Sequence, residues 1–352
     1  VDDTGTILDD DLARDAATAV RFLDDVIDAT PYFSELHVAM QRDGTRRVGL
    51  GTMGLADALI KLRVAYGSAE SLEVIDRIYR TIRDAAYRET VALAEEKGAC
   101  GFFDAEPYLE GVFIQRLPED IREGIRQHGV RNGVVLTQAP TGTTSLLAGV
   151  SSGVEPVFDF AMKRVDRIGE HIIYHPLYQA WLAAHPGEDR PAYFVGARDL
   201  TPEQHIRMQA RIQAYTDSSI SKTANGPSGN TVDDVKRLYM LAYDLGCKGV
   251  TYYREGSRDA VLTGVTEQPA MERHEGASMP HENQSATTTV AASETADLAS
   301  VIDALQFDAP EAADEAFPTW MLEGRLKRRP QQMAGVTQNM AAPEGKVNIT
   351  IN

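Results

Sequence analysis

The stretch Val134-Val-Leu-Thr-Gln-Ala-Pro-Thr-Gly-Thr-Thr-Ser-Leu-Leu-Ala-Gly-Val-Ser-Ser-Gly-Val-Glu-Pro-Val-Phe158 decides the fold. Its apolar start, residues 134–136, predicts a buried strand that stops at Pro140. A loop rich in threonine and serine follows, and an apolar run able to start a helix comes directly after it. A strand, a tight loop and a helix N-terminus form a geometry that binds phosphate, because free N–H groups and the helix dipole favour an anion there.

The composition of this loop supports phosphate binding. The loop has four hydroxyl groups within five residues, from Thr141, Thr143, Thr144 and Ser145. Gly142 lets a ligand approach the backbone closely. The loop contains no lysine, which excludes the GxxxxGK[ST] nucleotide loop. A loop of this kind can also be a helix N-cap with spare hydroxyls, and spacing alone leaves that alternative open.

The overall composition is that of an acidic globular protein. Hydrophobic residues make up 43% of the 352 residues, and 52 acidic against 35 basic residues give a formal charge of −17. Such acidity disfavours nonspecific binding to nucleic acid or to an anionic membrane. Only Cys100 and Cys247 occur, both in contexts that favour a structural role, so we expect no disulfide framework and a cytoplasmic location. No secretory signal or apolar run of membrane-spanning length is seen, so no membrane partner is expected.

Apolar periodicity and capping residues predict helices separated by short extended segments. Helix caps are expected at Ser68 or Ser71, at Thr201 and at Thr231. This alternation indicates an α/β layout with a mostly parallel sheet. The predicted helices cover residues 9–29, 54–63, 68–96, 118–128, 177–184, 202–215 and 231–245, and a predicted strand covers residues 248–253.

Other regions depart from this pattern. The glycine-rich residues 46–54 are expected to bring a strand end against a helix, and residues 100–117 to be irregular. Residues 265–317 mix polar residues, proline and alanine without periodicity, which predicts a disordered linker. A small unit, residues 318–352, begins after it. Its basic cluster, residues 325–330, is interpreted as a solvated face.

Four segments, in order, resemble the large chain of ribonucleotide reductases. The substrate-phosphate loop of that family is similar to two runs of this chain, Ala139-Pro-Thr-Gly-Thr-Thr-Ser145 and Gly149-Val-Ser-Ser-Gly-Val-Glu-Pro156. The family's glycine-rich segment, downstream of its catalytic cysteine, resembles Arg46-Arg-Val-Gly-Leu-Gly-Thr-Met-Gly-Leu-Ala-Asp57. Two further segments resemble the adenosylcobalamin-dependent branch: His205-Ile-Arg-Met-Gln continuing to Thr216-Asp-Ser-Ser-Ile-Ser-Lys-Thr-Ala-Asn225, and Leu245-Gly-Cys-Lys-Gly-Val-Thr-Tyr-Tyr-Arg-Glu-Gly-Ser-Arg258. The match is collinear over most of residues 10–263.

The resemblance implies a more specific α/β fold than periodicity could predict. It implies the C-terminal half of a ten-stranded α/β barrel built from two antiparallel halves, here occupying residues 1–264. The linker at residues 265–317 and the start of a small β-containing C-terminal extension at residues 318–352 would follow. The chain begins at Val1, not at methionine, and ends in an alternating β pattern at residues 346–352, so we expect a fragment of a longer protein.

The resemblance also implies an activity. The expected reaction is reduction of ribonucleoside diphosphates to 2′-deoxyribonucleoside diphosphates by thiyl-radical chemistry, for DNA precursor synthesis. The family places its radical cysteine, an asparagine and a glutamate upstream of the segment that matches residues 10–57. Catalytic residues are therefore expected upstream of Val1 and none within the chain. The implied cofactor is adenosylcobalamin. The implied partners are the ribonucleoside diphosphate substrate, the N-terminal remainder of the enzyme, a thioredoxin-type reductant and a second copy in a homodimer, with no nucleic acid.

Substrate positioning is then the chemistry expected of this chain. Glu155 is expected to brace the loop and not to meet the anion, since like charges repel. Contact with the substrate phosphates is expected from Pro140, Thr141, Gly142, Thr143, Thr144 and Ser145, with support from Ser151, Ser152, Gly153 and Glu155.

Two other motifs have competing interpretations. Tyr252 and Tyr253 resemble a tyrosine pair that carries a radical between subunits in the oxygen-dependent branch. The preferred interpretation is that they are neighbouring tyrosines of one strand, which pack on opposite faces. The i, i+4 spacing of His171 and His175 could suit a metal on a helix face. Because no carboxylate or cysteine partner lies within sequence reach, no metal site is expected.

Three functional hypotheses follow. The first is a ribonucleoside-diphosphate reductase dependent on adenosylcobalamin. The second is a nucleotide-phosphate-binding split partner that has no activity alone and completes a site with a separate N-terminal polypeptide. The third is the large chain of an oxygen-dependent reductase, which the tyrosine pair supports and the segment at residues 216–225 opposes.

Overall fold

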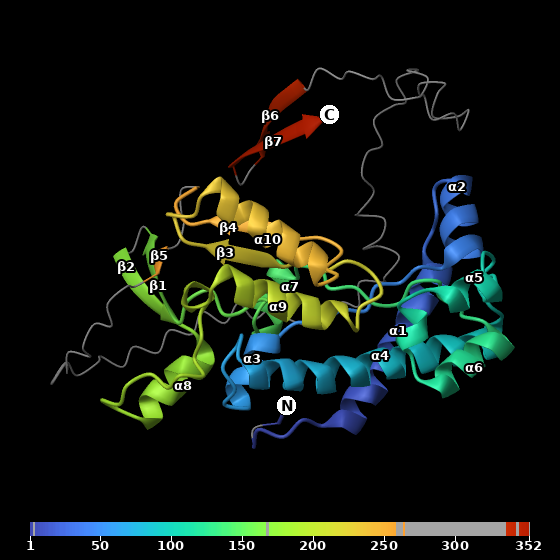
Figure 1. Cartoon of the computed structure of the whole chain (residues 1–352), viewed down its shortest axis with the longest axis horizontal. Helices are drawn as coiled ribbons and strands as arrows, with labels where there is room; N and C mark the ends of the chain where they lie inside the picture. Colours follow the sequence, from blue (N-terminus) through green and yellow to red (C-terminus); the bar gives the residue numbers. More distant parts are fainter. Residues whose placement is uncertain (3, 167–168, 258–262, 265–335, 343–344, 352) are drawn as a thin grey trace, which may run out of the picture. The chain divides into compact units, whose positions relative to one another are not determined.

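Helices and short strands alternate along most of the chain (Figure 1). The computed structural model describes residues 1–2, 4–166, 169–257, 263–264, 336–342 and 345–351. The chain divides into two units, Val1–Glu272 and Arg273–Asn352, which are described separately. The α-helices are α1 (Asp9–Ala29), α2 (Glu35–His37), α3 (Leu55–Lys61), α4 (Ala69–Lys97), α5 (Ala105–Glu110), α6 (Glu119–His128), α7 (Gly142–Ala148), α8 (Pro176–Ala184), α9 (Pro202–Gln213) and α10 (Val232–Asp244). A π-helical turn, Val38–Thr45, and two 3₁₀ turns, Ile114–Arg116 and Ala197–Asp199, complete the helical elements.

The strands form three small sheets. β1 (Ala161–Asp166) and β2 (Gly169–Tyr174) make an antiparallel hairpin, and β5 (Thr263–Gly264) pairs antiparallel with the other edge of β1. β3 (Thr223–Gly226) pairs in parallel with β4 (Thr251–Arg254). In the second unit, β6 (Val336–Ala342) and β7 (Gly345–Ile351) form an antiparallel hairpin.

Four extended segments of the first unit lie parallel to one another. Leu50 forms a parallel bridge with Leu136, and Gln138 forms the next one with Ile220. The chain continues from Ile220 into β3, which pairs with β4. These contacts confirm the predicted α/β layout. The expectation of a mostly parallel sheet needs correction, because among the described strands only β3 and β4 pair in parallel and the other strand pairs are antiparallel. Within the described residues the sheets do not close into a barrel, so the ten-stranded barrel is not seen here.

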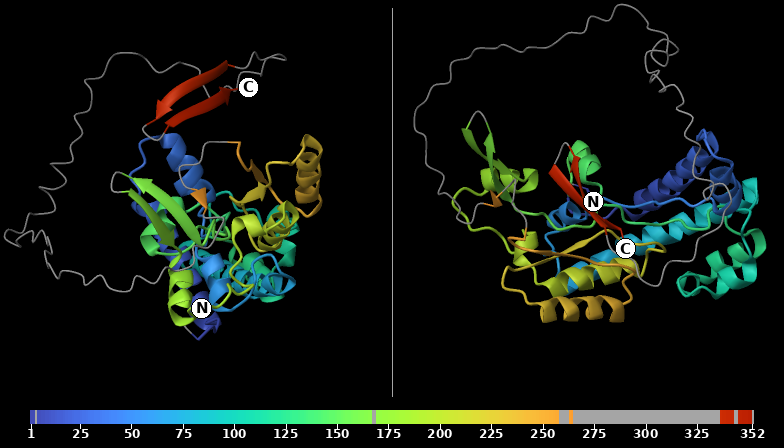
Figure 2. Two further views of the ribbon diagram at one scale, coloured as in Figure 1. Left: turned by 90° about the vertical axis from the view of Figure 1, so that its left-hand side faces the viewer. Right: turned by 90° about the horizontal axis from the view of Figure 1, so that it is seen from above.

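The central helix α4 organises the core. One face of α4 buries Ile75, Tyr79, Ile82 and Ala86, at the spacing expected of an amphipathic helix. This helix contacts α1, α6 and α9. α9 lies between α4 and α10, as the views in Figures 1 and 2 agree. α9 also contacts β3, so this helical layer packs against one of the parallel segments.

Local capping signals account for the helix starts. Ser68 Oγ accepts a hydrogen bond from Ser71 N–H at 3.1 Å, which makes Ser68 the cap of α4. Thr201 and Thr231 each form a capping box with the side chain three residues later. The seven predicted helices are all present, and their bounds differ from the prediction by a few residues.

Several expectations need correction. Residues 100–117 are not wholly irregular, because they contain α5 and a 3₁₀ turn. The strand predicted from residue 248 begins at Thr251. Residues 134–136 are not a regular strand, and among them only Leu136 forms a bridge, to Leu50. The predicted linker at residues 265–317 lies outside the described residues. The alternating pattern at the C-terminus is confirmed as β7.

The glycine-rich segment also packs differently from the expectation. Gly49 and Gly51 lie against the neighbouring extended segment at Thr137, not against a helix. A Cβ atom at Gly51 would lie 2.5 Å from the Thr137 carbonyl oxygen. The glycines therefore let two parallel backbones come close together.

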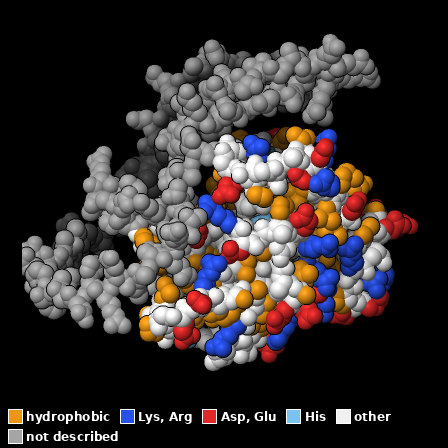
Figure 3. Space-filling view, turned by 60° about the vertical axis from the view of Figure 1, so that its left-hand side comes forward, with side chains coloured by type: hydrophobic (Ala, Val, Ile, Leu, Met, Phe, Trp, Pro, Cys, Tyr) orange, Lys and Arg blue, Asp and Glu red, His pale blue; other side chains and the backbone are white. Residues whose placement is uncertain are grey.

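The surface carries both signs of charge. On the face shown in Figure 3, lysine and arginine side chains are interspersed with aspartate and glutamate. Pairs such as Arg88 with Asp120, 2.8 Å apart, join exposed side chains of different helices. On this face, acidic and basic side chains are therefore intermixed, without a large patch of one sign.

Candidate functional site

The predicted phosphate loop, residues 140–145, lies at the start of α7. Thr141 has a φ of 52°, in the left-handed region, and Gly142 begins the helix. Gly142, Thr143 and Thr144 are exposed. No backbone acceptor in the described part of the chain takes a hydrogen bond from these three N–H groups, as expected for the first turn of a helix. The loop thus presents free amide donors to the outside.

The structure divides the four hydroxyls of the loop into two pairs. Thr141 Oγ1 accepts a hydrogen bond from Gly153 N–H at 2.7 Å, and buried Ser145 donates to the Gly142 carbonyl at 3.1 Å. The hydroxyls of Thr143 and Thr144 form no hydrogen bond with the residues described and face outward. Two hydroxyls therefore shape the loop, and two remain available to a ligand.

The second predicted segment, residues 151–155, is called here the support loop because it holds the phosphate loop from behind. Ser152 Oγ donates to the Pro140 carbonyl at 2.6 Å. Gly153 has a φ of 49°, and a Cβ atom there would lie 3.1 Å from the Ala139 carbonyl oxygen. Only glycine adopts this backbone without strain at such close approach.

One end of the support loop is fixed by Asp57 of α3. Asp57 Oδ2 accepts a hydrogen bond from Ser151 N–H, and Asp57 N–H donates to Ser151 Oγ at 3.3 Å. His175 Nε2 lies 3.1 Å from the other carboxylate oxygen of Asp57. Burial tends to raise the pKa of Asp57, but the hydrogen bonds from His175 and Ser151 outweigh it and leave that pKa below its usual value.

The other end is fixed by Glu155. Its Oε2 lies 2.7 Å from the ammonium group of Lys222, and its Oε1 accepts a hydrogen bond from Thr223 N–H at 2.6 Å. Lys222 also contacts Nδ1 of His205 at 3.2 Å, and Nε2 of His205 lies 3.2 Å from the Ala197 carbonyl. Both Lys222 and His205 are buried. No local sequence pattern indicates these partners of Glu155, since Glu155 and Lys222 lie 67 residues apart along the chain.

These contacts fix the protonation state of His205. An ammonium group has no acceptor, so Nδ1 must accept from Lys222 and the proton must reside on Nε2, which donates to Ala197. Burial, aided by the nearby charge of Lys222, lowers the pKa of His205 from 6.5 to about 3, although the bond to Ala197 opposes the shift. His205 therefore stays neutral at ordinary pH.

A pH dependence of stability follows from His205. Between pH 6.5 and about 3 the unfolded chain binds a proton there that the folded chain does not, so this residue makes stability fall as the pH drops. The slope is at most about 1.4 kcal/mol per pH unit. Glutamine can keep both hydrogen bonds without titrating, so His205→Gln should lose stability less steeply between pH 6.5 and 5. Urea unfolding at several pH values measures this, and parallel profiles for the two proteins would contradict it.

Two further polar residues support the loop and were not predicted. Buried Gln138 accepts through Oε1 from both the N–H and the hydroxyl of Thr52, each at 3.0 Å. Asp217 accepts from Val135 N–H at 2.8 Å and Leu136 N–H at 2.9 Å. Both hold the extended segment that enters the phosphate loop.

The cysteines are placed as structural residues would be. Cys100 is buried, and burial raises the pKa of its thiol. Cys247 is partly buried, and burial raises the pKa of its thiol to about 11. Thiols with raised pKa values are poor nucleophiles at neutral pH.

The tyrosine and histidine motifs are now located. Tyr252 and Tyr253 lie on β4, and the Tyr252 hydroxyl accepts a hydrogen bond from Asn230 at 2.7 Å. His171 lies on β2 and His175 caps α8, so the two do not share a helix face as their spacing could suggest. Among the residues described, no group of three or more His, Cys, Asp or Glu is arranged to hold a metal ion.

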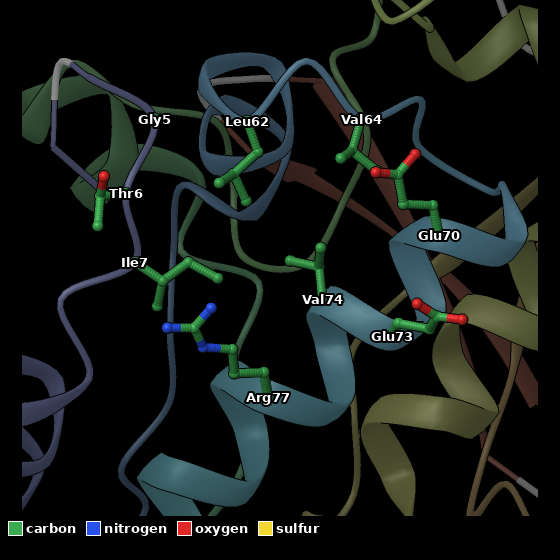
Figure 4. A pocket seen from close by; sticks show the side chains of 9 residues that line it. All are labelled: Gly5, Thr6, Ile7, Leu62, Val64, Glu70, Glu73, Val74 and Arg77. Atoms are coloured by element: carbon green, nitrogen blue, oxygen red, sulfur yellow. The ribbon is translucent and has the colours of Figure 1, made fainter.

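A separate hollow of about 430 Å³ lies beside α4 (Figure 4). Arg77 extends toward Ile7, while Glu70 and Glu73 project from the other end of the hollow. Arg77 is already paired with Asp9. None of the residues that line this hollow belongs to the phosphate loop or the support loop, so we assign no substrate contact to it. The lining residues are Gly5, Thr6, Ile7, Leu62, Val64, Glu70, Glu73, Val74 and Arg77.

Known proteins match most of the chain. Residues 1–253 match the model of the ribonucleotide reductase barrel domain. The chain is 37% identical over 288 residues to a vitamin B12-dependent ribonucleoside-diphosphate reductase of Mycobacterium tuberculosis, covering 74% of the chain and 39% of that protein. It is 38% identical over 286 residues to the protein of the same name from Thermoplasma acidophilum, covering 74% and 35%. A ribonucleoside-diphosphate reductase subunit alpha of Treponema pallidum is 29% identical over 270 residues, covering 73% and 30%.

The chain thus spans little more than a third of the length of the vitamin B12-dependent relatives it matches. Within the described part of the chain, no helix is both long enough and apolar enough to cross a bilayer.

Proposed function

The chain belongs to the ribonucleotide reductase barrel-domain family, and on this premise we propose that it supplies the substrate-phosphate loop of a ribonucleoside-diphosphate reductase. The reaction proposed for the whole enzyme is reduction of ribonucleoside diphosphates to 2′-deoxyribonucleoside diphosphates by thiyl-radical chemistry. The ten-stranded barrel would form when the parallel segments described above join the remaining barrel strands. The observation that carries the proposal is the exposed first turn of α7, with its free amide groups and the outward hydroxyls of Thr143 and Thr144.

The loop would act by holding the diphosphate of the substrate. Amide N–H groups at a helix N-terminus and neutral hydroxyls can bind an anion with no lysine in the loop. Fixing the phosphates fixes the ribose, which is where the reaction takes place. Neither Cys100 nor Cys247 lies in the phosphate loop or the support loop. Since the resemblance places the radical cysteine upstream of the segment that matches residues 10–57, we place that residue in another part of the enzyme.

The proposed cofactor is adenosylcobalamin, as for the relatives named vitamin B12-dependent. When bound, this group supplies the radical. Nothing in the described residues identifies a site for it: His175 bonds Asp57 through Nε2 and buries an unpaired Nδ1, and both ring nitrogens of His205 are engaged within the protein. We therefore assign none of them to the corrin and derive no step through it. A thioredoxin-type reductant and a second copy of the enzyme remain proposed partners.

The similarity to known proteins supports the adenosylcobalamin-dependent branch. Identity is 37–38% to the vitamin B12-dependent proteins and 29% to the subunit alpha of Treponema pallidum. The hydrogen bond between Tyr252 and Asn230 gives that hydroxyl a structural role. Turnover unaltered by Tyr252→Phe in the complete enzyme is the expected result, and a loss of activity would favour a radical relay.

A charge change at Gly142 tests the phosphate loop. A Cβ atom at Gly142 would meet no other atom within 4 Å, so a side chain fits there. Gly142→Asp would place a carboxylate where the proposal places the diphosphate, and Gly142→Asn has the same shape without the charge. A carboxylate in the first turn also favours the helix, so weaker binding could not come from unfolding of α7.

The expected result is a dissociation constant for CDP about tenfold or more higher for Gly142→Asp than for Gly142→Asn, measured by isothermal titration calorimetry on the 352-residue chain. Circular dichroism of both variants checks that they fold. Equal affinities in the two variants, or no binding of CDP by the unsubstituted chain, would count against the loop as the phosphate site.

A further inference from the structure

An ion pair between fully buried Lys222 and partly buried Glu155 connects the support loop to the neighbouring parallel segment. Lys222 lies two residues after the Ile220 bridge to Gln138, on the segment next to the one that enters the phosphate loop. Its side chain has no exposed surface. The ammonium group contacts Glu155 Oε2 at 2.7 Å, His205 Nδ1 at 3.2 Å and the Thr223 carbonyl at 3.3 Å. Three acceptors thus match its three hydrogens.

The carboxylate of Glu155 completes this bridge. One carboxylate oxygen accepts a hydrogen bond from Lys222 Nζ, and the other accepts one from Thr223 N–H. The segment that contains residues 222 and 223 therefore holds the Glu155 side chain at two points. On the other side, Glu155 N–H donates to the Ser152 carbonyl at 2.9 Å. The adjacent Gly153 N–H binds Thr141 Oγ1, and Ser152 Oγ binds the Pro140 carbonyl. A continuous set of hydrogen bonds therefore runs from Lys222 to the phosphate loop.

His205 fixes the position of Lys222 from α9. The imidazole lies between the ammonium group and the Ala197 carbonyl and is fully buried. The ring of Tyr66 lies 5.6 Å from the ammonium nitrogen, and the Tyr66 hydroxyl donates to the Val154 carbonyl at 2.6 Å. The same aromatic side chain therefore touches both the cation and the support loop.

We propose that Lys222 and His205 are positioning residues: through Glu155 they set the place of the support loop and, with it, the geometry of the nucleotide phosphate site. This inference rests on the proposed function, because it takes the ligand of the loop to be a nucleoside diphosphate. Both residues are buried and would act without touching that ligand. Burying an ammonium group is costly, and an apolar side chain of similar volume could fill the same space. What the ion pair adds is a fixed geometry between the two loops and the neighbouring segment.

A double-substitution cycle on the 352-residue chain tests this. Lys222→Met, Glu155→Gln and the combined variant are compared for CDP affinity and for amide hydrogen exchange at Gly153, well below the unfolding temperature. Each single change should raise the dissociation constant for CDP about tenfold, as expected for loss of one charge-assisted hydrogen bond. The combined variant should be no worse than either single one, because the two residues act as one unit. Exchange at Gly153 should become faster in all three.

Matched changes separate positioning from general stability. His205→Gln keeps one acceptor and one donor and should retain affinity within about twofold, whereas His205→Ala should not. Lys236→Met removes an exposed lysine that pairs only with Asp233 among the residues described, and it should change neither measurement. If a single variant does not fold, the combined variant, which leaves no charge buried alone, still gives both readouts.

The two proposals fail in distinguishable ways. If Gly142→Asp and Gly142→Asn differ in affinity while Lys222→Met binds CDP normally with unchanged exchange at Gly153, the loop binds phosphate and the positioning role is wrong. If the unsubstituted chain does not bind CDP, the proposed function is wrong. Exchange at Gly153 then still decides the positioning role, because it needs no ligand, and unchanged exchange would overturn it.

Discussion

Asp24→Asn should lower the free energy of unfolding by about 3–5 kcal/mol, because it removes the central carboxylate of a buried ion cluster. Asp24 has no exposed surface. Its Oδ1 lies 2.8 Å from the guanidinium of Arg46, and Oδ2 lies 3.3 Å from that of Arg131. Arg46 is itself buried and, among the residues that the structure describes, would keep only the partly exposed Asp28 as a counterion. An amide in place of the carboxylate would also turn a donor toward one of these cations.

The neighbouring residue provides the control for Asp24. Asp25 lies on the same helix, is 59% exposed and pairs with Lys97 at 2.7 Å. Asp25→Asn should change the free energy of unfolding by less than about 1 kcal/mol, as for other exposed ion pairs. Urea unfolding of both variants measures the difference, with an unchanged m-value as the sign that the comparison is valid. Similar losses in the two variants would show that burial of the cluster does not determine its contribution.

The helices could be predicted because their signals are local. In α1, Ala16, Val20 and Ile27 recur at helical spacing and are buried as expected. The caps at Thr201 and Thr231 lie three residues from the side chains that complete their capping boxes. A pattern within one turn of helix is enough to predict such features.

The partners of buried polar residues could not be predicted in this way. Asp24 occupies a position on the apolar face of α1, and its partner Arg131 is 107 residues away. Glu155 and Lys222 are 67 residues apart. The hairpin of β1 and β2 was missed as well, and so was the π-helical turn, Val38–Thr45. Contacts between distant segments depend on the fold as a whole, which periodicity does not encode.

The candidate site was predictable in place but not in detail. The order of strand, loop and helix gave the position of residues 140–145 at the start of α7. This order could not show which hydroxyls of the loop are bonded within the protein and which are available to a ligand. The partner of Thr141 is Gly153, 12 residues later in the support loop. The order of strand, loop and helix also could not identify Lys222 and His205 as residues that support the loop. The family resemblance includes them only as members of a longer matching segment.

Gly51→Ala is expected to have the other large effect, a loss of about 3 kcal/mol in the free energy of unfolding. The added methyl group would lie 2.5 Å from the Thr137 carbonyl oxygen, so one of the two parallel backbones must move. Backbone cannot rotate out of the way as a side chain can. The same movement would displace Gln138, whose Oε1 lies 3.5 Å from the new atom, and with it the entrance to the phosphate loop.

Gly49→Ala is the matched comparison for Gly51, two residues earlier on the same segment. Its methyl group would lie 2.7 Å from Cγ2 of Thr137, which is part of a side chain and can change rotamer. We expect a loss of about 1 kcal/mol, most of which Thr137→Ser should restore by removing the opposing methyl group. The same second change should not rescue Gly51→Ala, because the obstacle there is a carbonyl oxygen. Thermal or urea unfolding of the four variants measures this, and rescue of both glycine variants by Thr137→Ser would contradict close backbone contact as the reason for glycine at position 51.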